Sequence, residues 1–234
     1  KGNEVAFGSI GDASTSEGHF WETMNAAGVL QVPMAVTVYD DGYGISVPKE
    51  YQTTKGSISD ILKGFESEEG RPGIKIYKGK GWDYPGLLKL YEEGIEVCRK
   101  EHVPVLFHIE EVTQPLGHST SGSHERYKSP ERIKWEQDFD PIKKMKEWII
   151  GQNISTEEEL ANISSEAEEE AREARKKAWD MFQDPVRVER DALAKIIRNR
   201  TCRCNEEVKE ASVDEITEEL LKVLSPIRKD NFQA

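Results

Sequence analysis

Two acidic clusters have the residue types and the spacing to bind a metal ion. Gly11-Asp12-Ala13 and Asp40-Asp41-Gly42-Tyr43 each follow an apolar run that is typical of a β-strand. Between the clusters, Phe20, Met24 and Ala27 recur at helical spacing. A right-handed strand, helix, strand unit has parallel strands, so both clusters should lie at the same carboxyl edge of a sheet. Open α/β sheets bind their ligands at that edge.

The chemistry of these clusters fits a hard divalent cation. Mg²⁺ favours carboxylate and carbonyl oxygens and leaves coordination positions for phosphates. We expect side-chain oxygens from Asp12 and Asp41 and a backbone carbonyl from Tyr43. Ala13 to Ser16 should open the crossover helix with a serine or threonine N-cap. Its free N–H groups would favour an anion such as a diphosphate. The alternative is an ordinary helix cap beside an acidic surface turn.

Gly11-Asp12-Ala13 followed by Asp41 resembles the thiamine diphosphate motif, which is usually Gly-Asp-Gly followed by Asn-Asn. The flanking segments resemble, more narrowly, the alpha subunit of the decarboxylating component of 2-oxoacid dehydrogenase complexes. These segments are Ser16-Glu17-Gly18, Asn25-Ala26-Ala27 and Tyr43-Gly44-Ile45-Ser46. The resemblance covers about residues 1 to 182 and implies thiamine diphosphate and Mg²⁺ as cofactors. It places Gly11, Asp12, Ala13, Ser14 and Asp41 at the cofactor, and Asp12, Asp41 and Tyr43 at the metal.

Two positions depart from the family pattern. Ala13 stands where a glycine is usual, and Asp40-Asp41 stands where Asn-Asn is usual. Asp41 adds negative charge beside a diphosphate. A bound Mg²⁺ dominates local electrostatics and would absorb that charge, so we expect a working site. The alternatives are a weakened affinity for the cofactor or a lineage whose site is tuned differently.

A polar loop after residues 103 to 109 contains Gly117-His118-Ser119-Thr120-Ser121. In the family this loop carries a histidine that faces the diphosphate, followed by a serine that kinases modify in some members. By position, His118 is that catalytic and cofactor-binding histidine, and Ser119 is a candidate phosphorylation site. Imidazole donates hydrogen bonds and titrates near neutral pH. A phosphate on Ser119 would repel the diphosphate. The alternative is a solvated loop. His108, in the preceding strand, is expected to be a satisfied core or edge histidine.

The resemblance implies oxidative decarboxylation of a 2-oxo acid, either pyruvate or a branched-chain acid, with transfer of the acyl group to a lipoyl carrier. Its implied partners are a beta-type subunit or half, a lipoyl acyltransferase core and further copies in an oligomer. Because the family's activating glutamate comes from the beta part, we expect no turnover by this chain alone. One alternative is another thiamine diphosphate enzyme, such as an acetoin dehydrogenase. Another is a non-catalytic assembly module whose metal site has decayed.

Composition excludes some classes of partner. The 234 residues carry a formal net charge of −12, whereas nucleic-acid binding needs a basic face. No apolar run approaches the length of a membrane span. The chain begins with Lys1 and shows no signal peptide. We therefore expect part of a longer polypeptide, in the bacterial cytoplasm or alternatively the mitochondrial matrix.

The order of elements predicts an α/β fold with a doubly wound, mostly parallel sheet of the transketolase-like type and a helical C-terminal extension. Strands are expected at residues 5–10, 34–39, 74–77 and 103–109, with turns at 70–73 and 78–81. Ser155 or Thr156 should cap a long acidic helix whose narrow apolar stripe, from Leu160 to Phe182, suits packing along another helix or subunit. A further helix should carry Val213, Ile216, Leu220 and Leu224. We divide the chain into a cofactor domain (1–130), a helical extension (131–184) and a helical linker towards a downstream part (185–234).

Overall fold

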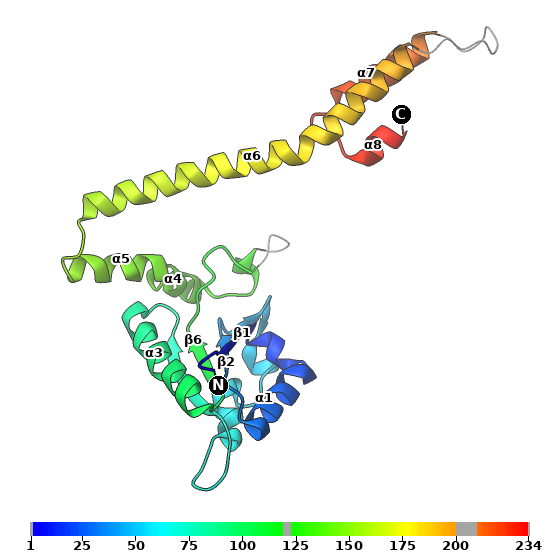
Figure 1. The fold of residues 1–234 in the computed structure, drawn as a ribbon. Coiled ribbons are helices and arrows are strands. Elements are labelled where there is room, and N and C mark those ends of the chain that lie inside the picture. The colour runs from blue at the N-terminus through cyan, green and yellow to red at the C-terminus, as the bar shows by residue number, and fades with distance from the viewer. Residues whose placement is uncertain (1, 119–122, 200–209, 234) are drawn as a thin grey trace. The chain divides into compact units, whose positions relative to one another are not determined.

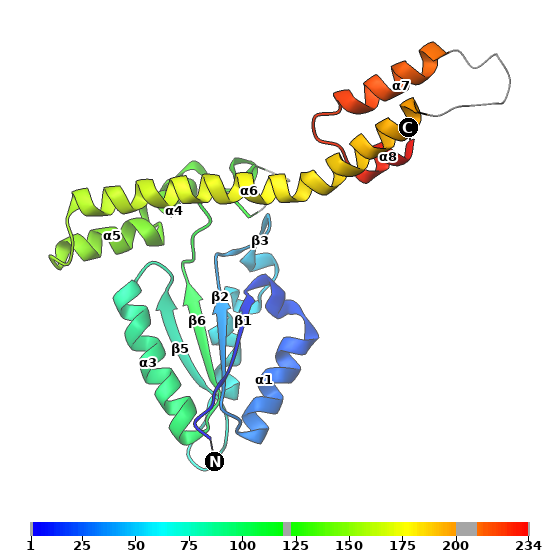
Figure 2. The same ribbon diagram turned by 45° about the horizontal axis from the view of Figure 1, so that its top comes forward.

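The computed structural model describes residues 2–118, 123–199 and 210–233. The chain divides into two compact units, Lys1–Ser155 and Thr156–Ala234. The first unit (Figure 1) is built on a four-stranded parallel sheet in the order β1-β2-β6-β5, which Figure 2 shows. The strands are β1 (Ala6–Gly11), β2 (Met34–Tyr39), β5 (Lys75–Lys80) and β6 (Val105–Glu110). The predicted α/β class and parallel sheet are therefore confirmed.

Helices cover both faces of this sheet because successive residues of the central strands point to opposite sides. Val36, Val38 and Leu106 pack with Phe20 and Met24 of α1 (Gly18–Leu30) on one face. This core also contains residues of α2 (Ile58–Ile61) and η4 (Leu62–Phe65). Ala35, Val105, Phe107 and Ile109 form the core of the other face, under α3 (Tyr84–Glu101). Figure 2 shows α1 and α3 on either side of the strands.

The remaining elements of the first unit are short. They comprise η1 (Ala13–Ser16), β3 (Tyr43–Gly44), β4 (Val47–Pro48), η2 (Lys49–Tyr51), η3 (Thr54–Gly56), η5 (His124–Arg126), α4 (Pro130–Asp138) and α5 (Pro141–Gly151). β3 and β4 form a small antiparallel hairpin directly after the Asp40-Asp41 turn. Asp83, Ser129 and Asp140 cap α3, α4 and α5 with side-chain oxygens. Each cap precedes a proline in the first turn, where its missing N–H has no cost.

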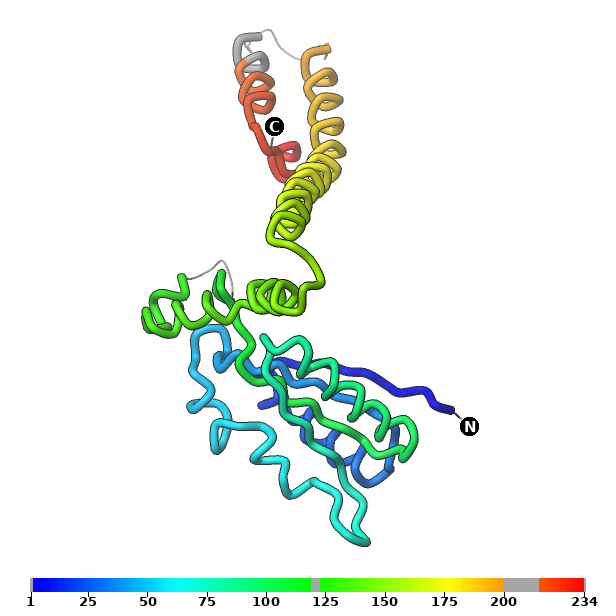
Figure 3. The backbone as a smooth tube through the Cα atoms, turned by 90° about the vertical axis from the view of Figure 1, so that its left-hand side faces the viewer, coloured from blue at the N-terminus to red at the C-terminus, as the bar shows by residue number. Residues whose placement is uncertain are grey.

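The second unit is helical. It contains α6 (Glu157–Arg198), α7 (Glu210–Lys222) and α8 (Arg228–Gln233), and α7 lies beside the distal part of α6 (Figure 3). Thr156 caps α6 in a capping box with Glu159, as the sequence predicts. Ile163 and Phe182 of the predicted stripe are exposed, so packing of that stripe against a partner stays a prediction. Among the described residues, no helix is both long and apolar enough to cross a membrane.

Three local predictions are wrong. The turn predicted at residues 78–81 is mostly strand, since β5 continues to Lys80. α1 begins at Gly18 after Glu17, and no side chain caps it, so the predicted serine or threonine N-cap is absent. Ala13 to Ser16 instead form the separate 3₁₀ turn η1. α7 ends at Lys222, which leaves Leu224 outside the helix and exposed. The three-part domain division stays a prediction, with α6 running through residue 184.

Candidate functional site

The register of the sheet brings the two acidic clusters together. β1 and β2 are parallel neighbours with Gly11 opposite Tyr39, so Asp12 and Asp40 follow directly at the same edge. The Asp12 N–H donates to the Tyr39 carbonyl at 2.9 Å and extends this pairing. Asp12, Asp40 and Asp41 are all buried. Three carboxyl groups therefore share one small, largely desolvated region at the carboxyl edge of the sheet.

The electrostatics of Asp12 reflect this crowding. Its pKa is raised to about 6, first by burial and then by the negative charges of Asp40 and Asp41. A hydrogen bond from the Ala13 N–H and the charge of Lys49 act in the opposite direction but do not outweigh these effects. An ionised Asp12 is therefore costly here unless another cation is present. Because Ala13 donates its N–H to Asp12, this amide is already engaged within the turn.

Asp41 has one satisfied and one unsatisfied carboxylate oxygen. Its Oδ1 accepts the Tyr43 N–H at 3.0 Å, whereas its buried Oδ2 has no hydrogen-bond partner. The His118 Nδ1 lies 3.5 Å from Oδ2, which is close enough for attraction when the imidazole is charged. A buried carboxylate oxygen without a partner is costly. It is also the kind of ligand that Mg²⁺ takes.

Asp40 differs from its neighbour in having partners for both oxygens. Oδ1 accepts the Gly42 N–H at 2.9 Å, and Oδ2 accepts Lys49 Nζ at 2.7 Å. The His108 Nε2 is 3.0 Å from the same Oδ2. Burial alone would raise the pKa of Asp40, but the hydrogen bonds from His108 and Lys49 hold it below its usual value. Asp40 is therefore an ionised group whose charge is compensated inside the fold.

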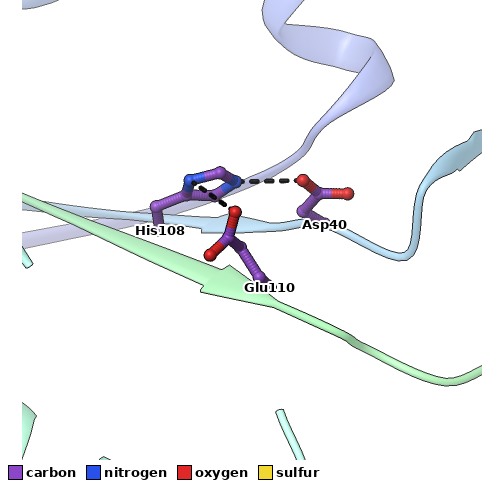
Figure 4. Close-up of side chains that lie close together, drawn as sticks. All are labelled: Asp40, His108 and Glu110. Carbon is purple, nitrogen blue, oxygen red and sulfur yellow. Dashed lines mark hydrogen bonds and ion pairs between the residues drawn. The ribbon is translucent and has the colours of Figure 1, made fainter. Parts of the chain in front are cut away.

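His108 is fully buried and hydrogen-bonded at both ring nitrogens, as Figure 4 shows for its Asp40 side. Its Nδ1 is 2.9 Å from Ser59 Oγ, which in turn is 3.1 Å from Ser57 Oγ. The expectation of a satisfied core histidine is confirmed. Nothing in the sequence pointed to Lys49 or Ser59, because each is brought to the network only by the tertiary fold.

Asp40, His108 and Glu110 also place potential metal-ligand atoms within 4.8 Å of one another. We assign this group to the hydrogen-bond network. Lys49 already supplies a cation to Asp40 Oδ2, and Ser59 occupies His108 Nδ1. Glu110 lies 3.9 Å from that same Nδ1 (Figure 4), on a different ring nitrogen from the one facing Asp40.

A second charged cluster, also missed by sequence analysis, supports the turn from α4. Arg132 donates from Nη2 to the backbone carbonyl of Asp41 at 2.8 Å and from Nε to Glu136 at 2.9 Å. Lys128 donates to both oxygens of Glu136 at 2.8 Å. The Arg132 guanidinium lies 5.5 Å from the centre of the Tyr43 ring. Lys128, Arg132 and Glu136 therefore form a clamp that holds the backbone of the Asp41 to Tyr43 turn in place.

The other predicted site residues are placed as follows. Gly11 ends β1, Ala13 and Ser14 lie in η1, and Tyr43 begins β3. Thr15 is buried and donates its hydroxyl to the Asp12 carbonyl. A pocket of about 220 Å³ lies beside η1. It is lined by Thr15, Ser16, Trp21, Gln52, Thr53, Thr54, Ile58 and Ile61. Ser119 lies outside the described residues.

The family model described as the dehydrogenase E1 component matches residues 1–186. The 3-methyl-2-oxobutanoate dehydrogenase subunit alpha of Mycobacterium tuberculosis is 30% identical over 177 residues, which cover 75% of this chain and 45% of the relative. The pyruvate dehydrogenase E1 component subunit alpha of Porphyra purpurea is 31% identical over 157 residues, covering 67% and 43%. The mitochondrial 2-oxoisovalerate dehydrogenase subunit alpha 1 of Arabidopsis thaliana is 27% identical over 188 residues, covering 80% and 38%.

The chain thus spans less than half the length of these three curated relatives. The match to the family model includes both acidic clusters and the His118 loop. Together with the buried carboxylates at the carboxyl edge of a parallel sheet, this match identifies the chain as a member of the dehydrogenase E1 component family, similar to its alpha subunits.

Proposed function

We propose that this chain is the cofactor-anchoring part of a 2-oxoacid dehydrogenase, which oxidatively decarboxylates a 2-oxo acid and passes the acyl group to a lipoyl carrier. The observation that carries the proposal is the buried Asp12 and Asp41 pair in a chain of this family. Asp12 has an elevated pKa and Asp41 has a buried oxygen without a partner. Both features favour a divalent cation at this position.

The residues present fit Mg²⁺ and a diphosphate. Asp12 and Asp41 would supply carboxylate oxygens and Tyr43 a backbone carbonyl, which are the ligand types that Mg²⁺ prefers. His118, which lies near Asp41 Oδ2, would donate a hydrogen bond to a diphosphate oxygen. Gly11, Ala13 and Ser14 would form the turn that the diphosphate approaches. Bound thiamine diphosphate would supply the electron sink for decarboxylation, while the protein supplies anchoring and orientation.

We infer a doubly wound sheet of the thiamine diphosphate-binding type, a cofactor domain in residues 1–130, a helical extension in 131–184 and a linker in 185–234. A beta-type subunit or half, a lipoyl acyltransferase core and oligomeric assembly would complete the enzyme. Relatives named for pyruvate and for 3-methyl-2-oxobutanoate match at similar identity, 31% and 30%, so we propose a substrate of the 2-oxo acid class. The compartment would be the bacterial cytoplasm or the mitochondrial matrix, and Ser119 would be a regulatory phosphorylation site.

Calorimetric titration of thiamine diphosphate into this chain tests the proposal. Heat of binding should appear with Mg²⁺ and disappear with chelator, and Asp12→Asn should abolish it. Glu92→Gln, an exposed change on α3, should leave it intact. Binding that does not depend on Mg²⁺ or on Asp12 would contradict the proposed anchoring site.

The isolated chain should show no turnover of a 2-oxo acid with an artificial electron acceptor, because the beta part would supply the remaining catalytic groups. Adding a beta-type subunit should create activity that Asp12→Asn abolishes. Product formation by the chain alone would contradict this division of the active site.

A further inference from the structure

Asp40 and Asp41 are adjacent in sequence, yet the structure gives their charges different surroundings. Asp40 accepts hydrogen bonds from several donors, including an ammonium group, whereas the buried Oδ2 of Asp41 accepts none. The proposed function needs a site that can accept a diphosphate. An acidic pair at this turn therefore raises the question of how the chain tolerates the additional charge.

We propose that Lys49 is a positioning residue that neutralises Asp40, so that only Asp12 and Asp41 present uncompensated charge to the bound cation. This inference rests on the proposed function and concerns the departure of this chain from the Asn-Asn pattern. An Asp40 and Lys49 pair carries no net charge, as an asparagine would. The acidic pair then contributes one negative charge to the site, that of Asp41.

Both the side chain and the backbone of Lys49 contact the Asp40-Asp41-Gly42 turn. Its Nζ is 2.7 Å from Asp40 Oδ2, and its backbone N–H donates to the Gly42 carbonyl at 2.9 Å. The side chain is 31% exposed, against 3% for that of Asp40. The ammonium group therefore reaches a buried carboxylate while part of its stem stays in solvent. Removing the ammonium group would leave a buried carboxylate charge without its counter-ion, which is more destabilising than the loss of a surface ion pair.

Lys49 is itself fixed by the local fold. It follows the β3 and β4 hairpin and opens η2, so the chain returns to the Asp40-Asp41 turn within one small loop. His108 Nε2 lies 3.0 Å from the same Asp40 oxygen that Lys49 bonds, and its Nδ1 is hydrogen-bonded to Ser59 at the start of α2. The segment between Lys49 and Ile61 thus contacts Asp40 directly through Lys49 and indirectly through Ser59, which bonds His108. It also forms a wall of the pocket beside η1.

Removing Lys49 or the charge of Asp40 changes the net charge beside the site in opposite directions. Without Lys49, Asp40 keeps its hydrogen bonds from the Gly42 N–H and from His108 but loses its ammonium partner. Its buried negative charge is then added to those of Asp12 and Asp41 near the proposed diphosphate site. Without the Asp40 charge, Lys49 leaves a positive charge near the site. Removing both charges together should restore a neutral turn that resembles the asparagine-containing pattern.

A double-mutant cycle with Lys49→Met, Asp40→Asn and the double variant tests this inference on the complete chain. The first readout is urea unfolding without metal or cofactor. Each single variant should lower the midpoint, and the double variant should be clearly more stable than the sum of the two losses predicts. Lys55→Met, an exposed change in the same segment, removes the same charge and should have little effect.

The second readout is the affinity for thiamine diphosphate with Mg²⁺, measured calorimetrically under conditions where each variant is folded. Lys49→Met should weaken binding by roughly tenfold or more, because the unpaired charge of Asp40 would then repel the diphosphate in a partly buried site, where charges are screened less than in water. The double variant should recover most of that loss. A purely structural role for Lys49 would lower stability without this charge-dependent recovery.

The two readouts separate the inference from the proposed function. Additive unfolding effects would overturn the Lys49 inference whatever the cofactor does. Absence of thiamine diphosphate binding by the unsubstituted chain would contradict the proposed function, while the unfolding cycle would still decide whether Lys49 neutralises Asp40. Equal affinities for all four proteins would overturn the role of Lys49 at the cofactor site.

Discussion

At the scale of single residues, the metal-free chain keeps Asp12 in surroundings that disfavour its charge. Its pKa rises from 3.8 to about 6, first through burial and then through Asp40 and Asp41. In the unfolded chain Asp12 ionises near its ordinary pKa, so ionisation favours unfolding as the pH rises from about 4 towards 6. Across that interval, ionisation of Asp12 should lower the free energy of unfolding by about 3 kcal/mol, at about 1.4 kcal/mol per pKa unit.

Asp12→Asn should therefore stabilise the metal-free chain at pH 7 and leave its stability nearly unchanged at pH 4. The gain at neutral pH should approach about 3 kcal/mol, the cost of ionising the buried carboxyl. Urea unfolding of both proteins at several pH values measures this difference. Because other carboxyl groups also titrate, the comparison uses the difference between the two proteins at each pH.

Glu92→Gln supplies the control for loss of one negative charge from an exposed position. This substitution should change the free energy of unfolding only slightly, and by nearly the same amount at each pH. Added Mg²⁺ should narrow the stability gap between the unsubstituted chain and Asp12→Asn, since the ion relieves the repulsion only where Asp12 is present. Equal stability of the two proteins at pH 7 without metal would contradict the electrostatic account of Asp12.

At the scale of elements, α4 contacts the Asp40-Asp41 turn through Arg132, which a buried carboxylate holds in place. Glu136 accepts hydrogen bonds from both Lys128 and Arg132, and Arg132 continues to the Asp41 carbonyl. The side chains of Lys128 and Glu136 are each only 1% exposed. Glu136→Gln would leave a buried ammonium group without its counter-ion, which typically costs about 3–5 kcal/mol.

Thermal and urea unfolding of Glu136→Gln measure this cost. Lys128→Met combined with Glu136→Gln should recover part of it, because the double variant removes the unpaired charge together with its partner. Glu147→Gln, which breaks an exposed ion pair on α5, should change stability by less than about 1 kcal/mol. A Glu136 variant as mild as this surface control would show that the clamp does not stabilise the turn.

The contact between α3 and the sheet depends on Gly94. A Cβ added there would lie 2.5 Å from two ring atoms of Phe107, which is fully buried. Gly94→Ala should therefore cost about 1–3 kcal/mol through overpacking, despite the higher helix propensity of alanine. Gly151→Ala at the end of α5 meets no atom within 4 Å and should be neutral or slightly stabilising. A stabilising Gly94→Ala would mean that α3 moves away from Phe107 without cost.

These elements also show why the sequence predicted some features and missed others. The strands and α1 were predictable because their apolar residues alternate or recur locally, and the same residues form the two cores. The end of β5 was not predictable in this way, because the glycines Gly79 and Gly81 suggest a turn. Gly79 instead lies inside the strand, where a Cβ would be 3.1 Å from Leu87 and Leu90, so the absent side chain lets α3 approach.

The same limit applies to the candidate site. Asp12, Asp41 and His118 could be predicted as site residues because motif spacing and family resemblance are read directly from the linear sequence. Lys49, Ser59 and Arg132 carry no local pattern, since their role depends on which strand edge, helix or loop lies beside them in the fold. The residues that contact a predicted ligand from elsewhere in the chain are therefore known only from the tertiary structure.

At the scale of the whole molecule, the chain contains two units with separate cores. The first unit holds the sheet and every residue of the candidate site, while the second has its own buried residues on α6 and α7, among them Val186, Ala194 and Leu220. Unfolding of the full chain is therefore expected in two steps, because units with separate cores need not unfold together. Mg²⁺ and thiamine diphosphate should shift only the step that belongs to residues 1–155, since ligands stabilise the unit that binds them.

Deleting residues 156–234 tests this separation and also decides between two functions. If the chain anchors a cofactor, residues 1–155 should keep the Mg²⁺-dependent rise in melting temperature with thiamine diphosphate, and Asp12→Asn should abolish it in the short and the full chain alike. A non-catalytic assembly module would instead depend on its acidic helix, so removing α6 would end its function in the complex while Asp12→Asn would not. Because the deletion removes no residue of the candidate site, loss of the cofactor-dependent shift in a folded 1–155 protein would contradict the anchoring role.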